Sequence, residues 1–369
     1  MKLEGIRVLD MSSFLPGPYM TLAMADHGAE VIKIEAPVGD PGRRIGLSDG
    51  PDTVFFRNLN RGKKSVVLNL KERRDHEILL SMADTADVIV ESWRPGVADR
   101  LGIGYETLSK RNLRIVYCSI SAFGQDGPYA SRPAHDLALE ALSGLLSTNL
   151  GSDGCPAIPS IPIADVTAGL QGLSGVLMAL LSRERTGKGD YVDISMHESL
   201  VGSMLNVLGP TMAEGRQPDP KVERTTGGAA FYNIYGLSDG RQIVLAGQEA
   251  KFVRNLLERL GRIDLAELCE RGPGAHQQPV VSLLQETFSR MTLPEVEQML
   301  GEIDVCWAPV KTMPEALDDP QLTTRDFIVR DSGGRQWIGP PIRFRQDPAK
   351  PRPVAPALDA DAALFRKDD

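Results

Sequence analysis

Short apolar runs alternate with amphipathic segments through residues 1–121. The runs with the length and composition of buried strands lie at residues 5–10, 28–35, 65–70, 86–92 and 113–121. The segments with helical spacing of apolar positions lie between them, at residues 17–27, 71–84 and 105–112. Strands that alternate with helices favour a parallel sheet covered by helices. The pattern therefore predicts one doubly wound α/β domain in the first half of the chain.

The pattern changes after this region. Residues 136–147 have apolar positions at helical spacing. Residues 155–166 are interrupted by proline, and we expect them to be extended because the residue before each proline is kept out of the α region. This extended stretch ends at Asp165. Residues 167–187 are nearly all apolar, which predicts a long helix buried on most of its sides.

A polar stretch rich in glycine and proline separates two predicted domains. Residues 215–228 have this composition and are interpreted as a linker. Residues 229–247 are typical of a β-hairpin with a Ser-Asp-Gly turn, and helical patterns follow. The prediction is a large domain of residues 1–214, completed by residues 335–369, and a smaller α+β domain of residues 229–334.

Composition narrows the classes of partner. The 369 residues carry a formal net charge of -8, which argues against nucleic acid or an anionic membrane as a bulk electrostatic partner. We expect no bilayer-spanning segment and no signal peptide. The four cysteines lack CxxC spacing and the five histidines lack HxxxH spacing, so no metal site is predicted. The expectation is a cytoplasmic protein that holds any anionic ligand at a local basic site.

Two residues near the predicted long helix are candidates for acid–base or nucleophilic chemistry. Asp165 lies between an extended segment and the helix, where an aspartate is often only an N-cap. The same position is also where α/β folds form ligand sites, so Asp165 is a candidate base or nucleophile. His135 precedes Asp136 at a predicted helix start. A histidine there is commonly structural, but it can exchange a proton near neutral pH.

Weaker signals lie in three other segments. Glu249 follows a predicted strand and is equally explained as a first-turn glutamate favoured by the helix dipole. The basic turns at residues 43–44 and 58–65 suit a phosphate, although most basic turns are simply solvated. Residues 14–19 form a weak candidate for a phosphate loop. From spacing alone, the chain is an α/β enzyme with a candidate phosphate-bearing ligand.

Several longer segments resemble the class III coenzyme A transferase superfamily, which also contains the α-methylacyl-CoA racemases. The resemblance covers the chain from its start to about residue 345. It is carried by PGPYMTLAMADHGAEVIKIE, NLNRGKKSVVLNL, ADVIVESWRPGVADRLGIGYETL, IVYCSISAFGQDGPYASRPAHD, ADVTAGLQGLSGVLMALLSRERTGKGDYVDISM and AFYNIYGLSDG. These motifs are specific to the superfamily and much less specific to the reaction.

The resemblance implies a fold, an assembly and a cofactor-binding surface. The fold would be a Rossmann-like large domain plus a smaller domain, and two chains would interlock into a homodimer. The CoA moiety of the substrate would be the only cofactor, with no metal. Its expected contacts are Leu59, Arg61, Lys63, Trp93, Arg100 and Ala134.

Two mechanisms share this scaffold by resemblance. In a racemase, Asp165 and His135 would exchange the proton α to the thioester carbonyl, with Glu249 supporting the histidine, and backbone N–H groups near Thr167 would stabilise the enolate. In a transferase, Asp165 would form a mixed anhydride and then an aspartyl-CoA thioester, which passes CoA to a second carboxylic acid.

Three features favour the racemase. They are the His-Asp pair at residues 135–136, the ESWRPGV turn, and Leu15 where formyl-CoA transferases place glutamine. The transferase is the alternative, because many transferases of the superfamily also carry the His-Asp pair. A non-catalytic partner subunit is a minor alternative, which the presence of Asp165 disfavours. The acyl group cannot be inferred, since an apolar binding surface and a packed core have the same composition.

Overall fold

The chain forms two compact units. The computed structural model describes residues 1–151 and 153–366. The first unit takes residues 1–143, residues 159–203 and the chain from residue 320 on, and the second takes residues 144–158 and 204–319. The sequence had placed the first boundary at residue 214 and the return at residue 335. The first boundary comes earlier than predicted. Helix α8 (Met196–Ser203) still packs on α6 and α7, and the chain enters the second unit directly after it.

The first unit is built on a six-stranded sheet. Its strands are β1 (Arg7–Asp10), β2 (Glu30–Glu35), β5 (Lys64–Val67), β6 (Val88–Glu91), β7 (Val116–Ser121) and β8 (Tyr191–Ser195). They lie in the order β5-β2-β1-β6-β7-β8, and every pairing is parallel. This confirms the predicted parallel α/β fold. The strand order reverses between β1 and β6, which is where a doubly wound sheet opens a ligand crevice at its carboxyl edge.

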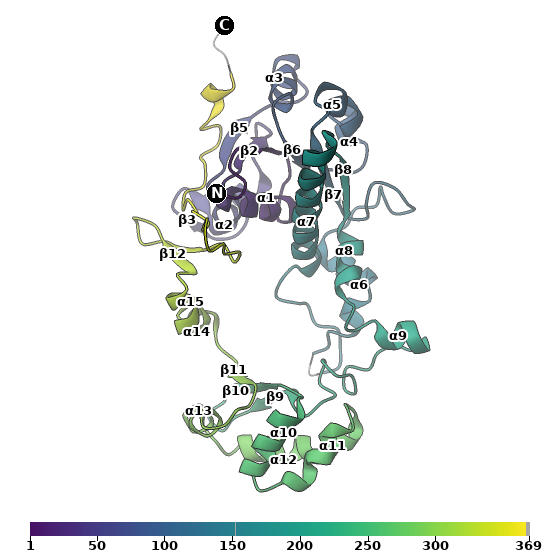
Figure 1. Ribbon diagram of the computed structural model, residues 1–369, viewed down its shortest axis with the longest axis vertical. Coiled ribbons are helices and arrows are strands. Elements are labelled where there is room, and N and C mark those ends of the chain that lie inside the picture. Colours follow the sequence, from purple (N-terminus) through teal and green to yellow (C-terminus); the bar gives the residue numbers. More distant parts are fainter. Residues whose placement is uncertain (152, 367–369) are drawn as a thin grey trace. The chain divides into compact units, whose positions relative to one another are not determined.

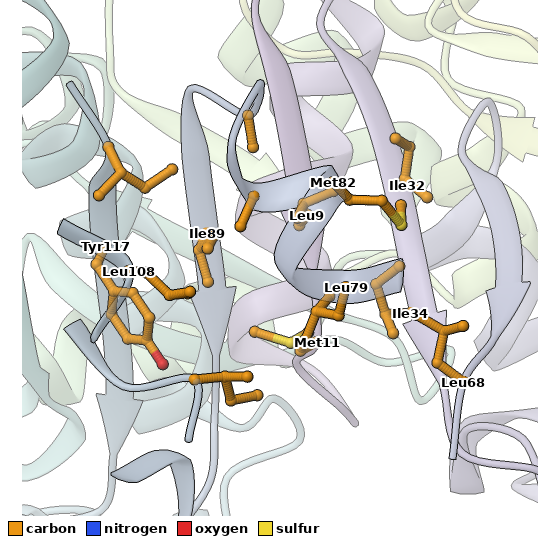
Figure 2. Close-up of a cluster of buried hydrophobic side chains, with 14 of the residues drawn as sticks. Leu9, Met11, Ile32, Ile34, Leu68, Leu79, Met82, Ile89, Leu108 and Tyr117 are labelled. Carbon is orange, nitrogen blue, oxygen red and sulfur yellow. The ribbon is translucent and has the colours of Figure 1, made fainter. Parts of the chain in front are cut away.

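Helices cover both faces of this sheet (Figure 1). The helices before the second unit are α1 (Pro16–Asp26), α2 (Val54–Asn60), α3 (Arg73–Ala83), α4 (Val97–Arg100), α5 (Tyr105–Arg111), α6 (Asp136–Leu142), α7 (Ile163–Thr186) and α8. A short hairpin of β3 (Ser48–Asp49) and β4 (Asp52–Thr53) precedes α2. Figure 2 shows Leu79 and Met82 of α3 packed on Leu9, Ile32 and Ile89 of the strands.

Helix α7 lies close to the sheet and to α1. It begins at Ile163, not near Thr167 as the sequence suggested, so Asp165 lies inside its first turn. A Cβ atom on Gly169 would lie 2.7 Å from the carbonyl oxygen of Pro16, so only glycine allows this approach of α1 and α7. By length and composition α7 is apolar enough to cross a membrane, contrary to the sequence expectation, but here it packs on α1, β7 and β8.

The C-terminal segment protects the edge strand β5. The backbone N–H groups of Ser65 and Val67 donate to the carboxylates of Asp361 (2.9 Å) and Asp359 (2.7 Å). These contacts satisfy donors that an edge strand would otherwise leave open. Through these contacts the C-terminal segment packs on the first unit. The tail also contains α15 (Pro320–Thr324), β12 (Ile328–Arg330) and β13 (Gln336–Ile338).

The second unit is a small α+β body. Strands β9 (Tyr232–Gly236) and β10 (Gln242–Ala246) form the predicted antiparallel hairpin, and β11 (Trp307–Pro309) pairs with β10. Its helices are α9 (Gly209–Glu214), α10 (Ala250–Arg259), α11 (Ala266–Glu270), α12 (Gln278–Phe288), α13 (Leu293–Gly301) and α14 (Met313–Leu317). Its core, centred on Phe231, Tyr235 and Phe288, is separate from the core of the first unit.

Candidate active site

Asp165 is held at the junction of α6 and α7. The carboxylate of Asp136, the first residue of α6, accepts hydrogen bonds from the backbone N–H groups of Ala164 (2.7 Å) and Asp165 (3.2 Å). Glu140, one turn further along α6, accepts from the N–H of Ile163 at 3.3 Å. The two carboxylates therefore satisfy donors that a helix N-terminus leaves open, and they fix the backbone that carries Asp165.

The same two carboxylates set the electrostatics of Asp165. Burial raises the pKa of Asp165, and the charges of Asp136 and then Glu140 raise it further, to about 7. The pKa of Glu140 is also raised, first by burial and then by Asp136. Among the described residues, none donates a hydrogen bond to the Asp165 carboxyl group. Asp165 is thus half-buried and uncompensated by a cation in the described part of the chain, a combination that is common at functional sites.

This arrangement corrects one expectation about charge stabilisation. The backbone N–H groups at the start of α7 were expected to bind the thioester oxygen of an enolate. The N–H groups of Ile163, Ala164 and Asp165 instead bind the carboxylates of Asp136 and Glu140. These donors are therefore occupied, and the first turn of α7 does not offer them to a developing oxyanion.

His135 lies at the same junction, immediately before Asp136. It is the N-cap residue of α6, its side chain is exposed, and it makes no side-chain capping hydrogen bond. Its ring meets the ring of Phe14 edge-on, with centroids 5.9 Å apart. Phe14 has a φ of 62°, which is uncommon for a non-glycine residue and often marks a functional loop. The sequence drew attention to the loop at residues 14–19 but not to Phe14.

Glu249 belongs to the second unit. It is the N-cap residue of α10 and lines a cavity of about 550 Å³ with Arg224, Gln248 and Glu270. Asp165 and His135 belong to the first unit. The structure therefore brings Asp165 and His135 to one junction, and it places Glu249 in a separate folded body.

A second candidate region is the crevice at the carboxyl edge of the sheet. A cavity of about 370 Å³ is lined by residues that directly follow four strands: 11–13 after β1, 36–41 after β2, 68–71 after β5, and Trp93 after β6. Val97 and Leu101 complete its wall. It lies where the strand order reverses, as expected for a nucleotide site in a doubly wound fold. Trp93 lines this crevice, and its contact with CoA stays a prediction.

The cationic side chains of Arg61 and Lys63, in the basic turn at residues 58–65, bond to other groups of the protein. The ammonium of Lys63 is fully buried and donates to Asp10 (2.9 Å), Thr21 (2.8 Å), Asn60 (2.9 Å) and the carbonyl of Pro18 (3.1 Å). Arg61 is buried against Asp26 at 2.5 Å. Contrary to the sequence expectation, both cations are compensated within the protein and are not directed at an external phosphate.

The second basic turn is also internally bonded. Arg43 forms a two-point ion pair with Glu35, and Arg44 donates to the carbonyl of Val38. The structure instead places Lys71, whose side chain is exposed, at the edge of the 370 Å³ cavity. Sequence reasoning missed Lys71, although its position directly after a predicted strand was a usable signal.

The other three residues predicted to contact CoA differ in how far their side chains are exposed to solvent. Leu59 is buried in α2, Ala134 is half-buried just before His135, and Arg100 is exposed at the end of α4. Arg100 lies near Gly96, whose φ of 77° suits glycine. Within residues 1–151 and 153–366, no three His, Cys, Asp or Glu side chains are grouped as metal ligands.

The first unit thus combines a half-buried carboxylate that has no cationic partner among the described residues with a crevice at the carboxyl edge of its parallel sheet. The chain matches CoA-transferase family III over residues 3–362 and belongs to that family. It is 33% identical to the acetyl-CoA:oxalate CoA-transferase of Acetobacter aceti, over 99% of this chain and 95% of that protein. It is 32% identical to the succinyl-CoA:mesaconate CoA-transferase of Haloarcula marismortui, over 97% of this chain and 93% of that protein.

The fold leads to the same family. A crystal structure of a CaiB/BaiF family protein from Brucella suis superposes with a TM-score of 0.83 at 28% identity, covering 98% of each chain. The family consists of enzymes, and the names of these relatives describe transferases. They favour the alternative of the sequence analysis over the racemase that it preferred.

Proposed function

We propose that this protein is a CoA-transferase that moves CoA from an acyl-CoA to a second carboxylic acid, with Asp165 as the nucleophile. The observation that carries the proposal is the Asp165 carboxyl group, which is half-buried, has no cationic partner among the described residues, and is fixed by its own backbone contacts to Asp136. The named activities of the relatives support the reaction class.

The transfer requires two anhydrides and one thioester on Asp165. The carboxylate attacks the acyl-CoA carbonyl, forms a mixed anhydride and releases CoA thiolate. The thiolate then attacks the aspartyl carbonyl, forms the aspartyl-CoA thioester and releases the donor acid. The acceptor carboxylate attacks this thioester and displaces CoA thiolate, which attacks the acceptor carbonyl of the new anhydride. Product acyl-CoA departs, and the Asp165 carboxylate is regenerated.

The surroundings of Asp165 suit this sequence of steps. Asp136 and Glu140 hold the first turn of α7, so the nucleophile has a defined position relative to the substrate. Their charges destabilise the free carboxylate, which makes the attacking group more basic and its conversion to a neutral anhydride or thioester more favourable. No step needs His135 as a base.

The CoA moiety is assigned to the crevice at the carboxyl edge of the sheet. Trp93 and Leu101 supply apolar wall, and Lys71 supplies a cation at its edge. Arg100 is exposed on the adjoining α4. The acceptors named for the relatives are small dicarboxylic acids, so oxalate, mesaconate and glutarate are the first acceptors to assay.

A homodimer remains our expectation for the assembly. Apolar side chains on the outer face of α7 support it, since Leu170, Met178 and Leu181 are 47%, 69% and 77% exposed. Light scattering on the purified protein would test this expectation. A cytoplasmic location also remains a prediction.

The decisive assay compares transfer with α-proton exchange. Purified protein is incubated in D₂O with a racemic 2-methylacyl-CoA, with and without an acceptor acid. We expect CoA transfer that survives His135→Ala and is lost in Asp165→Ala. Deuterium incorporation at the α carbon without an acceptor, lost in both variants, would show a racemase and contradict the proposal.

A further inference from the structure

The first unit contains a second cavity, on the other side of the turn that carries Trp93. It has a volume of about 280 Å³ and is lined by Glu91 at the end of β6, by Tyr117 and Ser119 of β7, and by Tyr191 at the start of β8. None of its lining residues lines the 370 Å³ crevice. The turn at residues 93–101 separates the two cavities. Trp93, Val97 and Leu101 face the crevice, whereas Arg94, Ala98 and Asp99 line the second cavity.

Three tyrosine rings form one wall of this second cavity. The ring centroids of Tyr105 and Tyr191 are 5.3 Å apart, those of Tyr117 and Tyr191 are 5.8 Å apart, and those of Tyr105 and Tyr117 are 6.3 Å apart. Figure 2 shows the Tyr117 ring beside Leu108. Clustered aromatic faces of this kind attract a cationic group.

Two polar groups of the cavity are buried without a partner. Tyr117 is 1% exposed, and no described group bonds to its hydroxyl. The side-chain nitrogen of Gln125 is likewise buried and unpartnered among the described residues. Buried polar groups in folded proteins are rarely left unbonded, so two of them lining a cavity of this size indicate a missing bonding partner.

The charges that line the cavity are mainly acidic. Glu91 is 3% exposed, and its carboxylate accepts from the backbone N–H of Trp93 at 2.7 Å and from the hydroxyl of Ser119. Asp99 and Glu106 also line the cavity, and Arg94 is its one cationic lining residue, with an exposed side chain. Burial raises the pKa of Glu91 to about 7, and the charges of Asp193 and Asp99 act in the same direction. Glu91 therefore lacks the cationic compensation that a buried carboxylate normally has.

We propose that this cavity binds a small organic cation, a substituted ammonium group, against the wall formed by Tyr105, Tyr117 and Tyr191 and beside the carboxylate of Glu91. The tyrosine faces distinguish this site from a metal site, as does the absence of any three-residue metal-ligand group in the described part of the chain. The orphan hydroxyl of Tyr117 provides a hydrogen bond to a polar substituent of the ligand.

The location implies a coupling with the CoA crevice, and this consequence alone rests on the proposed function. Glu91 holds the N–H of Trp93, whose side chain lines the crevice. A cation that stabilises ionised Glu91 strengthens its hold on the turn at residues 93–101. The bound cation should then raise the affinity for acyl-CoA, and bound acyl-CoA should raise the affinity for the cation by the same factor, because coupling between two sites is reciprocal.

The test is titration calorimetry of the full chain without CoA, in potassium phosphate buffer, with choline as the probe. The matched control ligand is 3,3-dimethyl-1-butanol, which has the shape of choline and no charge. We expect saturable choline binding with a Kd of roughly 10 mM or tighter, and binding of the neutral alcohol at least about tenfold weaker. Absence of saturable choline binding, or equal binding of the two ligands, would overturn the proposal.

Two variants locate the site. Glu91→Gln keeps the shape and removes the charge, and we expect choline to bind about tenfold more weakly. Tyr117→Phe removes only the orphan hydroxyl, so it should preserve the fold and weaken choline by a few-fold. Glu184→Gln, an exposed change elsewhere in the same unit, should leave binding unchanged. Choline binding unaffected by both cavity variants would contradict the assignment. The experiment contains no acyl-CoA, so its result is independent of whether the protein is a transferase.

Discussion

Two buried acidic clusters in the first unit have opposite electrostatics. Asp10, at the end of β1, accepts from the ammonium of Lys63 at 2.9 Å and from the hydroxyl of Thr21 at 2.6 Å. Burial by itself would raise the pKa of Asp10, but the charges of Lys63 and Lys33 hold it well below its usual value. Within residues 1–151 and 153–366, the charged groups that act on Asp165 are the carboxylates of Asp136 and Glu140, and its pKa is raised to about 7.

The difference separates a structural carboxylate from a reactive one. A buried carboxylate with a cation and full hydrogen bonding is stabilised as an anion, which makes it a poor base and nucleophile. A buried carboxylate beside other carboxylates is destabilised as an anion and gains by reacting. The protein therefore uses aspartate in two ways. Asp10 holds β1 to the turn before β5 through Lys63, and Asp165, we propose, attacks a thioester.

The largest expected effect is on catalysis, from Asp165→Asn. The amide keeps the shape but cannot form the anhydride or the thioester, so kcat for CoA transfer should fall by at least about 10³-fold. The Asp10 cluster is untouched, so the variant should remain folded. The measurement is product acyl-CoA formation by chromatography. Residual transfer within tenfold of the parent protein would exclude Asp165 as the nucleophile.

Asp165→Asn should also stabilise the protein in a defined pH window. The folded-state pKa of Asp165 is raised from an ordinary value near 4 to about 7, so ionisation opposes folding. The penalty is absent below about pH 4, grows between pH 4 and 7, and is complete above pH 7. Removing the charge should therefore add roughly 1–3 kcal/mol at pH 8 and nothing at pH 4. Thermal unfolding at the two pH values measures this, and a gain confined to pH 4 would reverse the assigned electrostatics.

Lys63→Met should break the other cluster. It removes the cation bonded to Asp10 and leaves Lys33 as the remaining positive charge nearby, so the protein should lose up to about 3–5 kcal/mol of stability. Denaturant unfolding measures the loss. The matched variant is the double change Lys63→Met with Asp10→Asn, which removes both charges and should regain part of the stability. If Lys63→Met instead left stability unchanged and weakened acyl-CoA binding, Lys63 would be a phosphate ligand as the sequence suggested.

Trp93→Ala should affect binding of the substrate more than its reaction. The side chain lines the crevice after β6, whereas Asp165 lies in the first turn of α7, so KM for acyl-CoA should rise about tenfold while kcat changes less than about threefold. Trp337 in β13 offers a control because its ring packs on Arg57 and does not line the crevice. A Trp93→Ala variant with unchanged KM would place the CoA moiety elsewhere.

The smallest expected effect is a shift in pH dependence from Asp136→Asn. The amide oxygen can still accept from the N–H groups of Ala164 and Asp165, but the negative charge is gone. The pKa of Asp165 should fall, so the rise of kcat/KM with pH should move to lower pH by roughly one unit. Glu140→Gln should move it in the same direction by less, since Glu140 is the weaker influence. A shift to higher pH would contradict this source of the raised pKa.

Much of the fold could be predicted from local pattern. The apolar runs that became β1, β2, β5, β6 and β7 were found in the sequence, because buried parallel strands are short and continuously apolar. The antiparallel hairpin of the second unit was found from its turn residues. The boundaries of the two units were not predicted. Residues 144–158 belong to the second unit, and this assignment depends on long-range packing that leaves no local pattern in the sequence.

The candidate site was predictable only in part. Asp165 was found from its place before an apolar helix, but the roles of Asp136 and Glu140 depend on how α6 meets the N-terminus of α7. Lys63 was misread because a basic residue in a turn has the same sequence signal whether it faces solvent or a buried aspartate. Spacing alone cannot tell these two environments apart.

The most direct test of the central claim follows the oxygen atoms of Asp165. The protein is incubated with an acyl-CoA donor and an acceptor acid whose carboxylate is labelled with ¹⁸O. The protein is then digested, and the mass of the peptide that contains Asp165 is measured by mass spectrometry. The two-anhydride route leaves one acceptor oxygen on Asp165 in each turnover, so we predict ¹⁸O in this peptide and none in the peptide containing Asp10. CoA transfer without label on Asp165 would contradict a covalent role for this residue.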